Sequence, residues 1–304
     1  MDVGVIGVGS MGKNHARVYS ELKNVDNVYV TDLNQEMARK VAEANGTKLS
    51  TKAELLLSNV DAISICVPTE YHHDIALKAF EAGVHVLIEK PVCSTVASAN
   101  FLLREAPKDL IVGVGHIERF NPIVNEIHNM INYRPAYIET KRHNPSSARG
   151  NHSIVKDLMI HDIDVVFNIL DKPKCTSMSS SGTNDLCGAL FDLDGTTAYM
   201  SASRKSSKKI RTIYIEQEDC TIEGDYMSQE ITIYSKPGRY NIESNRYVQE
   251  NVIEKVLVTK QEPLKQELST FINCVKTKTP FPVTLEQATF NLEVAERIER
   301  GVRV

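Results

Sequence analysis

The stretch DVGVIGVGSMG, residues 2–12, decides the fold of this 304-residue chain. A short run of Val and Ile, typical of a buried strand, leads directly into a G-x-G-x-x-G turn that opens a helical pattern. The first glycine permits the tight turn, the second lets backbone N–H groups approach a pyrophosphate, and the third lets helix and strand pack closely. A turn that serves packing alone is the alternative. In this context we expect a dinucleotide-phosphate site formed by Gly7, Gly9, Ser10, Met11 and Gly12.

An alternation of apolar and amphipathic segments continues to about residue 115. Short apolar runs at 3–6, 27–31, 62–67, 85–88 and 110–114 alternate with amphipathic segments near 12–22, 34–44, 70–82 and 94–105. Strands that are apolar throughout are typical of a parallel sheet covered on both faces by crossover helices. Right-handed crossovers then give an α/β fold with a doubly wound Rossmann sheet. We expect a dinucleotide-binding domain over residues 1–118.

Beyond residue 118 the pattern changes. A strand at 136–141, an amphipathic helix near 155–170, alternating strands across 174–235 and helices near 262–276 and 285–299 follow one another. They predict a C-terminal α+β domain, residues 119–304, in which helices cover one face of a largely antiparallel sheet. The other face of this sheet would be exposed to solvent unless another subunit covered it. We therefore expect this domain to bind substrate and to form a homodimer or homotetramer.

Composition excludes several classes of protein. The formal net charge of -4 and the pI near 6.2 exclude a sequence-independent nucleic-acid binder. No segment approaches the roughly 20 apolar residues of a membrane span, and the chain enters a strand without a leader segment. Six cysteines without a C-x-x-C pair favour reduced thiols over disulfides or a zinc site. We expect a cytoplasmic protein with no metal and no nucleic-acid or membrane partner.

Asp32 ends the second strand, about twenty residues after the last glycine of the turn. A carboxylate at this place accepts hydrogen bonds from the adenosine ribose and repels a 2′-phosphate. No Lys or Arg lies among residues 33–38 to neutralise such a phosphate. The sequence therefore predicts NAD as the cofactor. A cap of the following helix is the alternative role of Asp32, and the two roles are compatible.

The run VHVLIEKP, residues 84–91, ends a buried strand with Glu89, Lys90 and Pro91. Ligands of doubly wound sheets bind beyond the carboxyl ends of the strands, so Lys90 is placed to reach them. Proline biases the residue before it toward extended conformations, which gives Lys90 a defined exit from the strand. From position alone, a solvated lysine is an equally good interpretation.

Asp157 and His161 are four residues apart and share one face of the predicted helix near 155–170. Asp164 and Asn168 continue this polar stripe, while apolar residues such as Ile163 form the opposite side. Taken without context, the stripe indicates an ordinary amphipathic helix with its polar face in water.

Three motifs together resemble the Gfo/Idh/MocA oxidoreductases, and the resemblance covers nearly the whole chain. They are the glycine-rich turn, Glu89-Lys90-Pro91 and the stretch DLMIHD at residues 157–162. In that family the lysine contacts the nicotinamide ribose and the substrate hydroxyl, a role that the match carries over to Lys90. An aspartate and a histidine flank the reacting carbon, and the match assigns these places to Asp157 and His161.

Two further segments are similar to the cofactor side of that family. Val67-Pro68-Thr69 with His72 looks like its loop after the third conventional strand, and GHIERFNP, residues 115–122, looks like its domain-crossing segment. The resemblance therefore implies further cofactor contacts from Val67, Pro68, His72, Glu89 and Asn121.

The chemistry of alcohol oxidation suits these residue types. Histidine, with an unperturbed pKa near 6.5, can accept the O–H proton while the carbon gives a hydride to nicotinamide. A protonated Lys90 stabilises the developing alkoxide and favours a neutral imidazole beside it. We therefore expect His161 as general base, Lys90 as electrostatic stabiliser and Asp157 as orienting residue. Where the family often has glycines, this chain has NHSIVK at 151–156, so the shape of that loop is not predicted.

Lys141, Arg142, His143 and Arg149 lie on and after the strand that leads to this helix, and such groups can clamp a diphosphate. A solvated basic loop is the alternative. The stretch 116–164 is similar to nucleotide-sugar members of the family, especially those that oxidise UDP-N-acetylglucosamine at position 3. The resemblance predicts a 3-keto sugar as product. It implies substrate contacts from Arg119, Arg142, Asn144, Asp157 and His161.

Other functions stay open. A dehydrogenase of a free polyol or aldose, such as inositol or glucose, needs no diphosphate clamp. Related enzymes use bound NAD transiently to drive glycoside cleavage without net redox change. A non-catalytic dinucleotide sensor is the third alternative, and the joint presence of Lys90, Asp157 and His161 argues against it.

Overall fold

The computed structural model describes residues 1–145, 153–236, 241–243, 246–248 and 252–301. The chain divides into two compact units, each with its own hydrophobic core. The first unit comprises Met1–Phe120 and Glu262–Glu293, and the second comprises Asn121–Gln261 and Val294–Val304.

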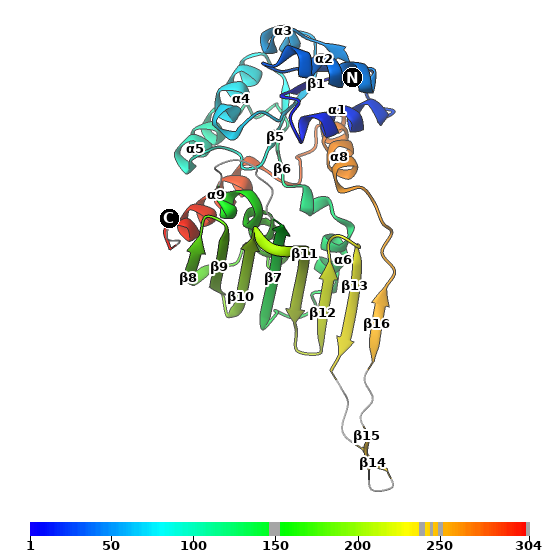
Figure 1. Ribbon diagram of the computed structural model, residues 1–304, viewed down its shortest axis with the longest axis vertical. Helices are drawn as coiled ribbons and strands as arrows, with labels where there is room; N and C mark the ends of the chain where they lie inside the picture. Colours follow the sequence, from blue (N-terminus) through cyan, green and yellow to red (C-terminus); the bar gives the residue numbers. More distant parts are fainter. Residues whose placement is uncertain (146–152, 237–240, 244–245, 249–251, 302–304) are drawn as a thin grey trace. The chain divides into compact units, whose positions relative to one another are not determined.

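The first unit is built on a six-stranded sheet in the order β3-β2-β1-β4-β5-β6, with every neighbouring pair parallel (Figure 1). The predicted Rossmann sheet is thereby confirmed. Its strands are β1 (Asp2–Ile6), β2 (Asn27–Thr31), β3 (Lys48–Leu49), β4 (Ala62–Ile65), β5 (His85–Glu89) and β6 (Val112–Gly115). Its first five helices are α1 (Gly12–Glu21), α2 (Gln35–Asn45), α3 (Ala53–Leu57), α4 (His72–Glu81) and α5 (Val96–Glu105). The sequence did not predict β3 and α3, because elements this short carry too little periodicity.

Helix α8 (Pro263–Thr277) completes this first unit, although the predicted domain limits place it in the second domain. Phe271 of α8 and Phe281 beyond it are buried in the core of the first unit. The ring of Phe281 stacks on Phe120 at 5.5 Å between centroids, and the backbone N–H of Val114 donates to the carbonyl of Val283. Burial of these apolar side chains in the core of the first unit stabilises the packing of this segment against that unit.

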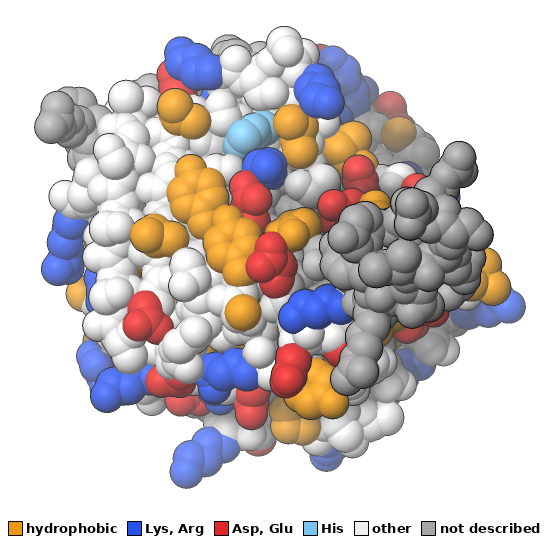
Figure 2. Space-filling view, turned by 90° about the horizontal axis from the view of Figure 1, so that it is seen from below, with side chains coloured by type: hydrophobic (Ala, Val, Ile, Leu, Met, Phe, Trp, Pro, Cys, Tyr) orange, Lys and Arg blue, Asp and Glu red, His pale blue; other side chains and the backbone are white. Residues whose placement is uncertain are grey.

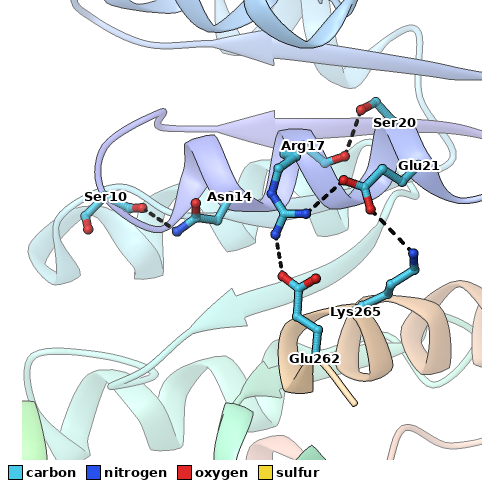
Figure 3. A network of polar contacts seen from close by, with 7 residues as sticks. All are labelled: Ser10, Asn14, Arg17, Ser20, Glu21, Glu262 and Lys265. Carbon is cyan, nitrogen blue, oxygen red and sulfur yellow. Dashed lines mark hydrogen bonds and ion pairs between the residues drawn. The ribbon is translucent and has the colours of Figure 1, made fainter. Parts of the chain in front are cut away.

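The contact between α1 and α8 also has a charged outer layer, drawn in Figure 3. Arg17 of α1 bonds Glu21 at 2.8 Å and also bonds Glu262, the N-cap residue of α8. Lys265 of α8 lies 3.4 Å from the second oxygen of Glu21. These side chains are about 40% exposed, so such pairs contribute little stability each; they instead mark where the two helices meet.

The second unit contains an eight-stranded sheet in the order β16-β13-β12-β11-β7-β10-β9-β8, mostly antiparallel, as predicted. Only β7 and β10 pair in parallel within it. The strands are β7 (Tyr137–Pro145), β8 (Cys175–Thr183), β9 (Leu186–Leu193), β10 (Thr196–Ser203), β11 (Lys205–Glu216), β12 (Cys220–Asp225), β13 (Glu230–Ser235) and β16 (Ile253–Val256). A separate hairpin joins β14 (Asn241–Glu243) and β15 (Arg246–Val248) (Figure 1).

Helices cover one face of this second sheet (Figure 1). They are α6 (Pro122–Met130), α7 (Ile160–Ile169) and the last residues of α9 (Leu285–Glu299). Along β9 the side chains alternate: Cys187, Ala189 and Phe191 are buried, whereas Leu186 and Leu190 are 47% and 45% exposed. One face of the sheet therefore forms the core, and no described segment covers Leu186 and Leu190 on the other face.

Among the described residues, no helix is long and apolar enough to cross a membrane. All six cysteines are free thiols.

Candidate active site

The turn after β1 has the geometry of a phosphate-binding turn. Gly7 has a φ of +87°, and a Cβ on Gly12 would lie only 1.8 Å from the carbonyl oxygen of Gly7. A Cβ on Gly9 would meet no atom within 4 Å. Gly9 and Ser10 are exposed, and Met11 gives α1 no side-chain cap. Exposed backbone N–H groups at an uncapped helix start fit the phosphates of a dinucleotide.

Asp32 is held at the edge of this turn. Its Oδ2 accepts the backbone N–H of Val8 at 2.8 Å, and its Oδ1 accepts the N–H of Asn34 at 2.8 Å. The side chain that caps α2 is that of Asn34, which accepts the N–H of Met37. Asp32 is therefore not the N-cap of α2, and its half-buried carboxylate lies beside the glycine turn at the end of β2.

His72 ties together the loops that follow β4 and β5. It is 1% exposed, with Nε2 at 2.9 Å from the carbonyl of Val67 and Nδ1 at 3.0 Å from the carbonyl of Pro91. Burial lowers the pKa of His72 and outweighs the opposite effect of these two carbonyls. The loop of Val67 and Pro68 in turn lies against the glycine turn, since a Cβ on Gly7 would meet the backbone nitrogen of Val67 at 2.7 Å. His72 therefore holds the loop after β4 and the loop after β5 next to each other.

Lys90 directly follows β5 and is half-buried. The peptide bond between Lys90 and Pro91 is cis. The backbone N–H of Lys90 donates to Oε2 of Glu89 at 3.2 Å, and Oε1 of Glu89 lies 2.9 Å from Nε2 of His15 on α1. Burial raises the pKa of Glu89, but His15 and the charge of Lys90 outweigh it and hold that pKa below its usual value. Glu89 is therefore a buried carboxylate directly beside Lys90.

In the second unit, Asp157 lies in a π-helical turn, Val155–Met159, that leads into α7. Single π-helical turns within helices occur frequently at functional sites. Nη2 of Arg204, between β10 and β11, donates to Oδ2 of Asp157 at 2.8 Å. Arg204 also donates to the carbonyl of Asn184 at 3.2 Å and lies 3.7 Å from Oδ1 of Asp185. The guanidinium anchors the Asp157 carboxylate to the sheet.

Helix α7 does not have a polar face in water. Asp162 and Asp164 are each 1% exposed, and His161 is half-buried. Asp164 belongs to the polar stripe that, taken without context, indicates a solvated face. Buried charges are costly unless other groups pair with them, so this stripe is not an ordinary surface.

Arg142 does not form a clamp with its neighbours in sequence. Its side chain is 1% exposed, and it holds Asp162 with Nε at 3.1 Å from both carboxylate oxygens and Nη2 at 2.7 Å. Successive side chains of a strand point to opposite faces, so Lys141 and His143 lie on the open face of β7. Lys141 there pairs with Glu139 at 3.0 Å. This buried ion pair argues against the predicted contact of Arg142 with a diphosphate.

The remaining predicted contacts divide into three kinds. Asn121 is 2% exposed and caps α6, and its Nδ2 donates to the carbonyl of Tyr226 at 3.1 Å, which argues against a cofactor contact. Asn144, half-buried at the end of β7, has an Oδ1 without a hydrogen-bond partner among the described residues. Arg119 is half-buried in the short helix that ends the first unit's N-terminal segment, whereas Arg149 lies outside the described residues.

Three residues that lie beside predicted site residues escaped the sequence analysis: Arg204, Glu267 and His15. Arg204 stands at a strand junction with no motif around it, and Glu267 reaches the first unit on α8. Only His15 carried a local signal, because it lies on the buried face of α1 three residues after Gly12.

The chain is similar to known proteins over most of its length. A model described as an oxidoreductase family with an NAD-binding Rossmann fold, GFO_IDH_MocA, matches residues 1–119. A UDP-N-acetylglucosamine 3-dehydrogenase of Acidithiobacillus ferrooxidans is 30% identical over 288 residues, which is 92% of this chain and 90% of that protein. An inositol 2-dehydrogenase of Rhodococcus erythropolis is 27% identical over 63% of this chain and 62% of its own length.

Solved structures extend the likeness to both units. The UDP-N-acetylglucosamine 3-dehydrogenase GnnA from Acidithiobacillus ferrooxidans superposes with a TM-score of 0.90 at 29% identity, covering 99% of this chain and 97% of that one. A levoglucosan dehydrogenase in complex with NADH and levoglucosan has a TM-score of 0.83 at 16% identity, covering 99% and 96% of the two chains. At that identity the second match shows a shared fold alone.

Proposed function

The chain belongs to the Gfo/Idh/MocA family of NAD-binding oxidoreductases, and on this premise we propose that it oxidises a ring hydroxyl of a nucleotide sugar. The proposed reaction converts UDP-N-acetylglucosamine to its 3-keto derivative and reduces NAD to NADH. The observation that carries the proposal is the 30% identity to a UDP-N-acetylglucosamine 3-dehydrogenase over nine-tenths of both chains. The inositol 2-dehydrogenase matches at 27% identity over 63% of this chain.

The first unit supplies the cofactor half of the proposed site. Backbone N–H groups of the glycine turn hold the pyrophosphate, and the Asp32 carboxylate accepts hydrogen bonds from the adenosine ribose. A 2′-phosphate would be repelled by Asp32, so NAD is preferred to NADP. Bound NAD would supply the hydride acceptor for oxidation of the sugar carbon. The other proposed contacts are the backbone of Val67 and Pro68, the loops ordered by His72, and Glu89 with Lys90.

The second unit supplies the proton chemistry. His161 accepts the hydroxyl proton while the C–H bond breaks, and the ammonium of Lys90 stabilises the negative charge that develops on the oxygen. Asp157 is the less suitable base, because its Oδ2 already accepts a hydrogen bond from Arg204 at 2.8 Å. It is better suited to orient the hydroxyl or the imidazole. Arg119 and Asn144 remain proposed substrate contacts.

Inositol dehydrogenases among the relatives make a free polyol the second candidate substrate. The structure favours it in one respect, since the buried Arg142 removes one cation from the expected diphosphate clamp. A polyol dehydrogenase needs no such clamp. The catalytic proposal for Lys90, Asp157 and His161 is the same in both cases.

The open face of the second sheet supports a further proposal, that copies of this chain associate. Leu186 and Leu190 project from it at 47% and 45% exposure. Seen from below, the surface in Figure 2 also carries hydrophobic side chains among acidic and basic ones. Covering such side chains stabilises a homodimer or homotetramer. Light scattering coupled to size exclusion measures the mass of the assembly.

The first test is NADH absorbance on mixing protein and NAD with UDP-N-acetylglucosamine, UDP-glucose, inositol or glucose, with NADP as cofactor control. NADH that forms only with the amino sugar supports the proposal. Turnover of inositol or glucose alone replaces the substrate and keeps the catalytic residues. Glycoside cleavage without net NADH supports the transient-oxidation alternative. His161→Ala should abolish turnover, and His128→Ala, on the exposed side of α6, is its matched control.

A further inference from the structure

The chain passes from one compact unit to the other three times, first at Phe120–Asn121 and next at Gln261–Glu262. The third passage runs inside the continuous helix α9. Residues 257–262, by contrast, form neither helix nor strand. We call residues 260–262 the second crossing. Each of these three residues makes a contact that holds this irregular segment in place.

On the side of the second unit, the turn between β12 and β13 holds the second crossing. The side-chain amide of Gln229 makes two hydrogen bonds with the backbone of Gln261. Its Nε2 donates to the carbonyl at 2.7 Å, and its Oε1 accepts the N–H at 3.0 Å. A pair of bonds of this kind also joins residues of neighbouring strands, and it fixes the direction of the backbone as well as its position. Beside it, Nζ of Lys260 lies 4.0 Å from Oε1 of Glu230 on β13.

The same turn also binds the first crossing, Phe120–Asn121. Nδ2 of Asn121 donates to the carbonyl of Tyr226 at 3.1 Å, and both residues are buried. The Asp225 carboxylate stiffens the turn, because its Oδ1 accepts two backbone N–H groups within it at 2.7 and 3.0 Å. One turn therefore holds both crossings. The bonds of Gln229 are exposed, so water competes for them, and a single side chain decides whether the second crossing is held.

On the side of the first unit, α1 holds the last residue of the second crossing. Arg17 of α1 bonds the carboxylates of Glu262 and Glu21 (Figure 3). Helix α1 begins at Gly12, the last glycine of the proposed phosphate-binding turn. Residues 261 and 262 are neighbours in the chain. The turn of the second unit is thus connected, through two adjacent residues, to the helix that follows the glycine turn.

We infer that Gln229 and Arg17 are positioning residues that hold the second crossing from its two sides and so restrain movement of the NAD-binding unit relative to α7. The inference rests on the proposed function, in which the first unit binds NAD and His161 of α7 takes the proton. Hydride transfer needs the reacting atoms roughly 3–3.5 Å apart, so a small movement between the two halves lowers its rate. Both contacts are exposed, so their loss should affect turnover more than stability.

The variants are chosen to keep the fold. Gln229→Gly removes the amide without straining the turn, because Gln229 has a φ of +56°, which glycine adopts readily. Arg17→Gln removes the guanidinium from α1 and keeps a residue of good helix propensity. Lys278→Gly is the control for the first change, since Lys278 is exposed and also has a φ of +56°. Arg39→Gln, in an exposed pair with Glu43 on α2, is the control for the second.

The kinetic test is a double-mutant cycle. Each single variant should lower kcat by roughly three- to tenfold, with the dissociation constant of NAD within about twofold of wild type. Both controls should keep wild-type kcat. The two contacts act in series on one segment, so the double variant should be no slower than the slower single variant. Wild-type kcat in either single variant, losses that multiply in the double variant, or an equal loss of NAD affinity would overturn the inference.

A second readout needs no sugar. Spin labels on non-natural residues replace Lys108, in the turn before β6, and Lys174, before β8, both exposed. Double electron–electron resonance measures the distance between them with NAD bound and unlabelled protein in excess. The distance distribution should broaden in Gln229→Gly and Arg17→Gln and keep its width in the controls. An unchanged width in both variants contradicts the inference whichever substrate is used. If the width increases but no tested sugar is oxidised, the proposed function fails and the restraint stands.

Discussion

Arg204 and Asp157, 47 residues apart in sequence, form a 2.8 Å hydrogen-bonded ion pair that fixes the proposed orienting carboxylate to the strand junction after β10. The Arg204 side chain is 10% exposed and that of Asp157 is 33% exposed. The arginine therefore lies behind the aspartate, which keeps part of its surface accessible.

Arg204→Gln tests this relationship. Without the guanidinium, Asp157 is neither oriented nor favoured as a carboxylate, so kcat should fall by about tenfold or more while NAD affinity stays within about twofold. Lys205→Gln, at the next residue and 67% exposed, is the control and should keep wild-type kcat. Steady-state NADH formation and calorimetric titration with NAD separate the two quantities. A loss of NAD affinity equal to the loss of kcat would contradict the assignment.

Gly9→Ala and Gly12→Ala should separate binding from folding. A methyl at Gly9 meets open space in the free protein, so the unfolding free energy should barely change while NAD binding weakens. A methyl at Gly12 would meet the Gly7 carbonyl at 1.8 Å, so this variant should lose stability as well. Urea denaturation and NAD titration measure both effects. If Gly9→Ala binds NAD as tightly as the wild-type protein, the pyrophosphate of NAD does not bind at this turn.

Arg142→Ala should destabilise the second unit by about 3–5 kcal/mol, because it leaves the buried Asp162 carboxylate without its guanidinium. Replacing both partners, as Arg142→Leu with Asp162→Leu, should recover much of this loss. Urea denaturation followed by circular dichroism gives the free energies. If Arg142→Ala keeps wild-type stability but has a raised KM for a UDP-sugar, the result would instead support the predicted contact of Arg142 with a diphosphate.

The buried His72 should make the first unit sensitive to acid. Burial lowers the pKa of His72 in the folded state, so below its ordinary value of about 6.5 the unfolded chain takes up a proton that the folded chain resists. The unfolding free energy should therefore fall as pH drops from 7 toward 5. His72→Gln should reduce this slope, measured by denaturation at several pH values. An equal slope in the variant would assign the acid sensitivity to other groups.

The parts of the fold that the sequence predicted are those with local, periodic signals. The apolar strands and the glycine turn of the first unit can each be recognised from a short stretch of sequence. The position of Lys90 could be predicted because it directly follows a strand. The burial of Arg142 could also have been predicted from the sequence. Buried and exposed side chains alternate along β7, and Arg142 lies on the same face as the buried Ile138 and Thr140. The diphosphate clamp was predicted from the positive charge of these residues alone. The pleat of the strand instead determines the face to which each side chain points.

The rest depended on contacts between distant segments. Glu267 lies 178 positions after Glu89 and meets it only because α8 returns to the first unit. Arg204 meets Asp157 through the placement of a strand junction beside a π-helical turn. Neither segment carries a motif, so pattern and spacing contain no information about these pairs.

The return of Glu262–Glu293 to the first unit affects how the protein is made. During synthesis the ribosome releases the six parallel strands long before α8, so the NAD-binding half cannot close its core until the second unit has already emerged. Transplanting that half into another protein would require two cuts in the gene and the joining of two separate coding segments. A single cut near residue 118 would yield a sheet without Phe271, Phe281 and Glu267, and such a fragment should be insoluble.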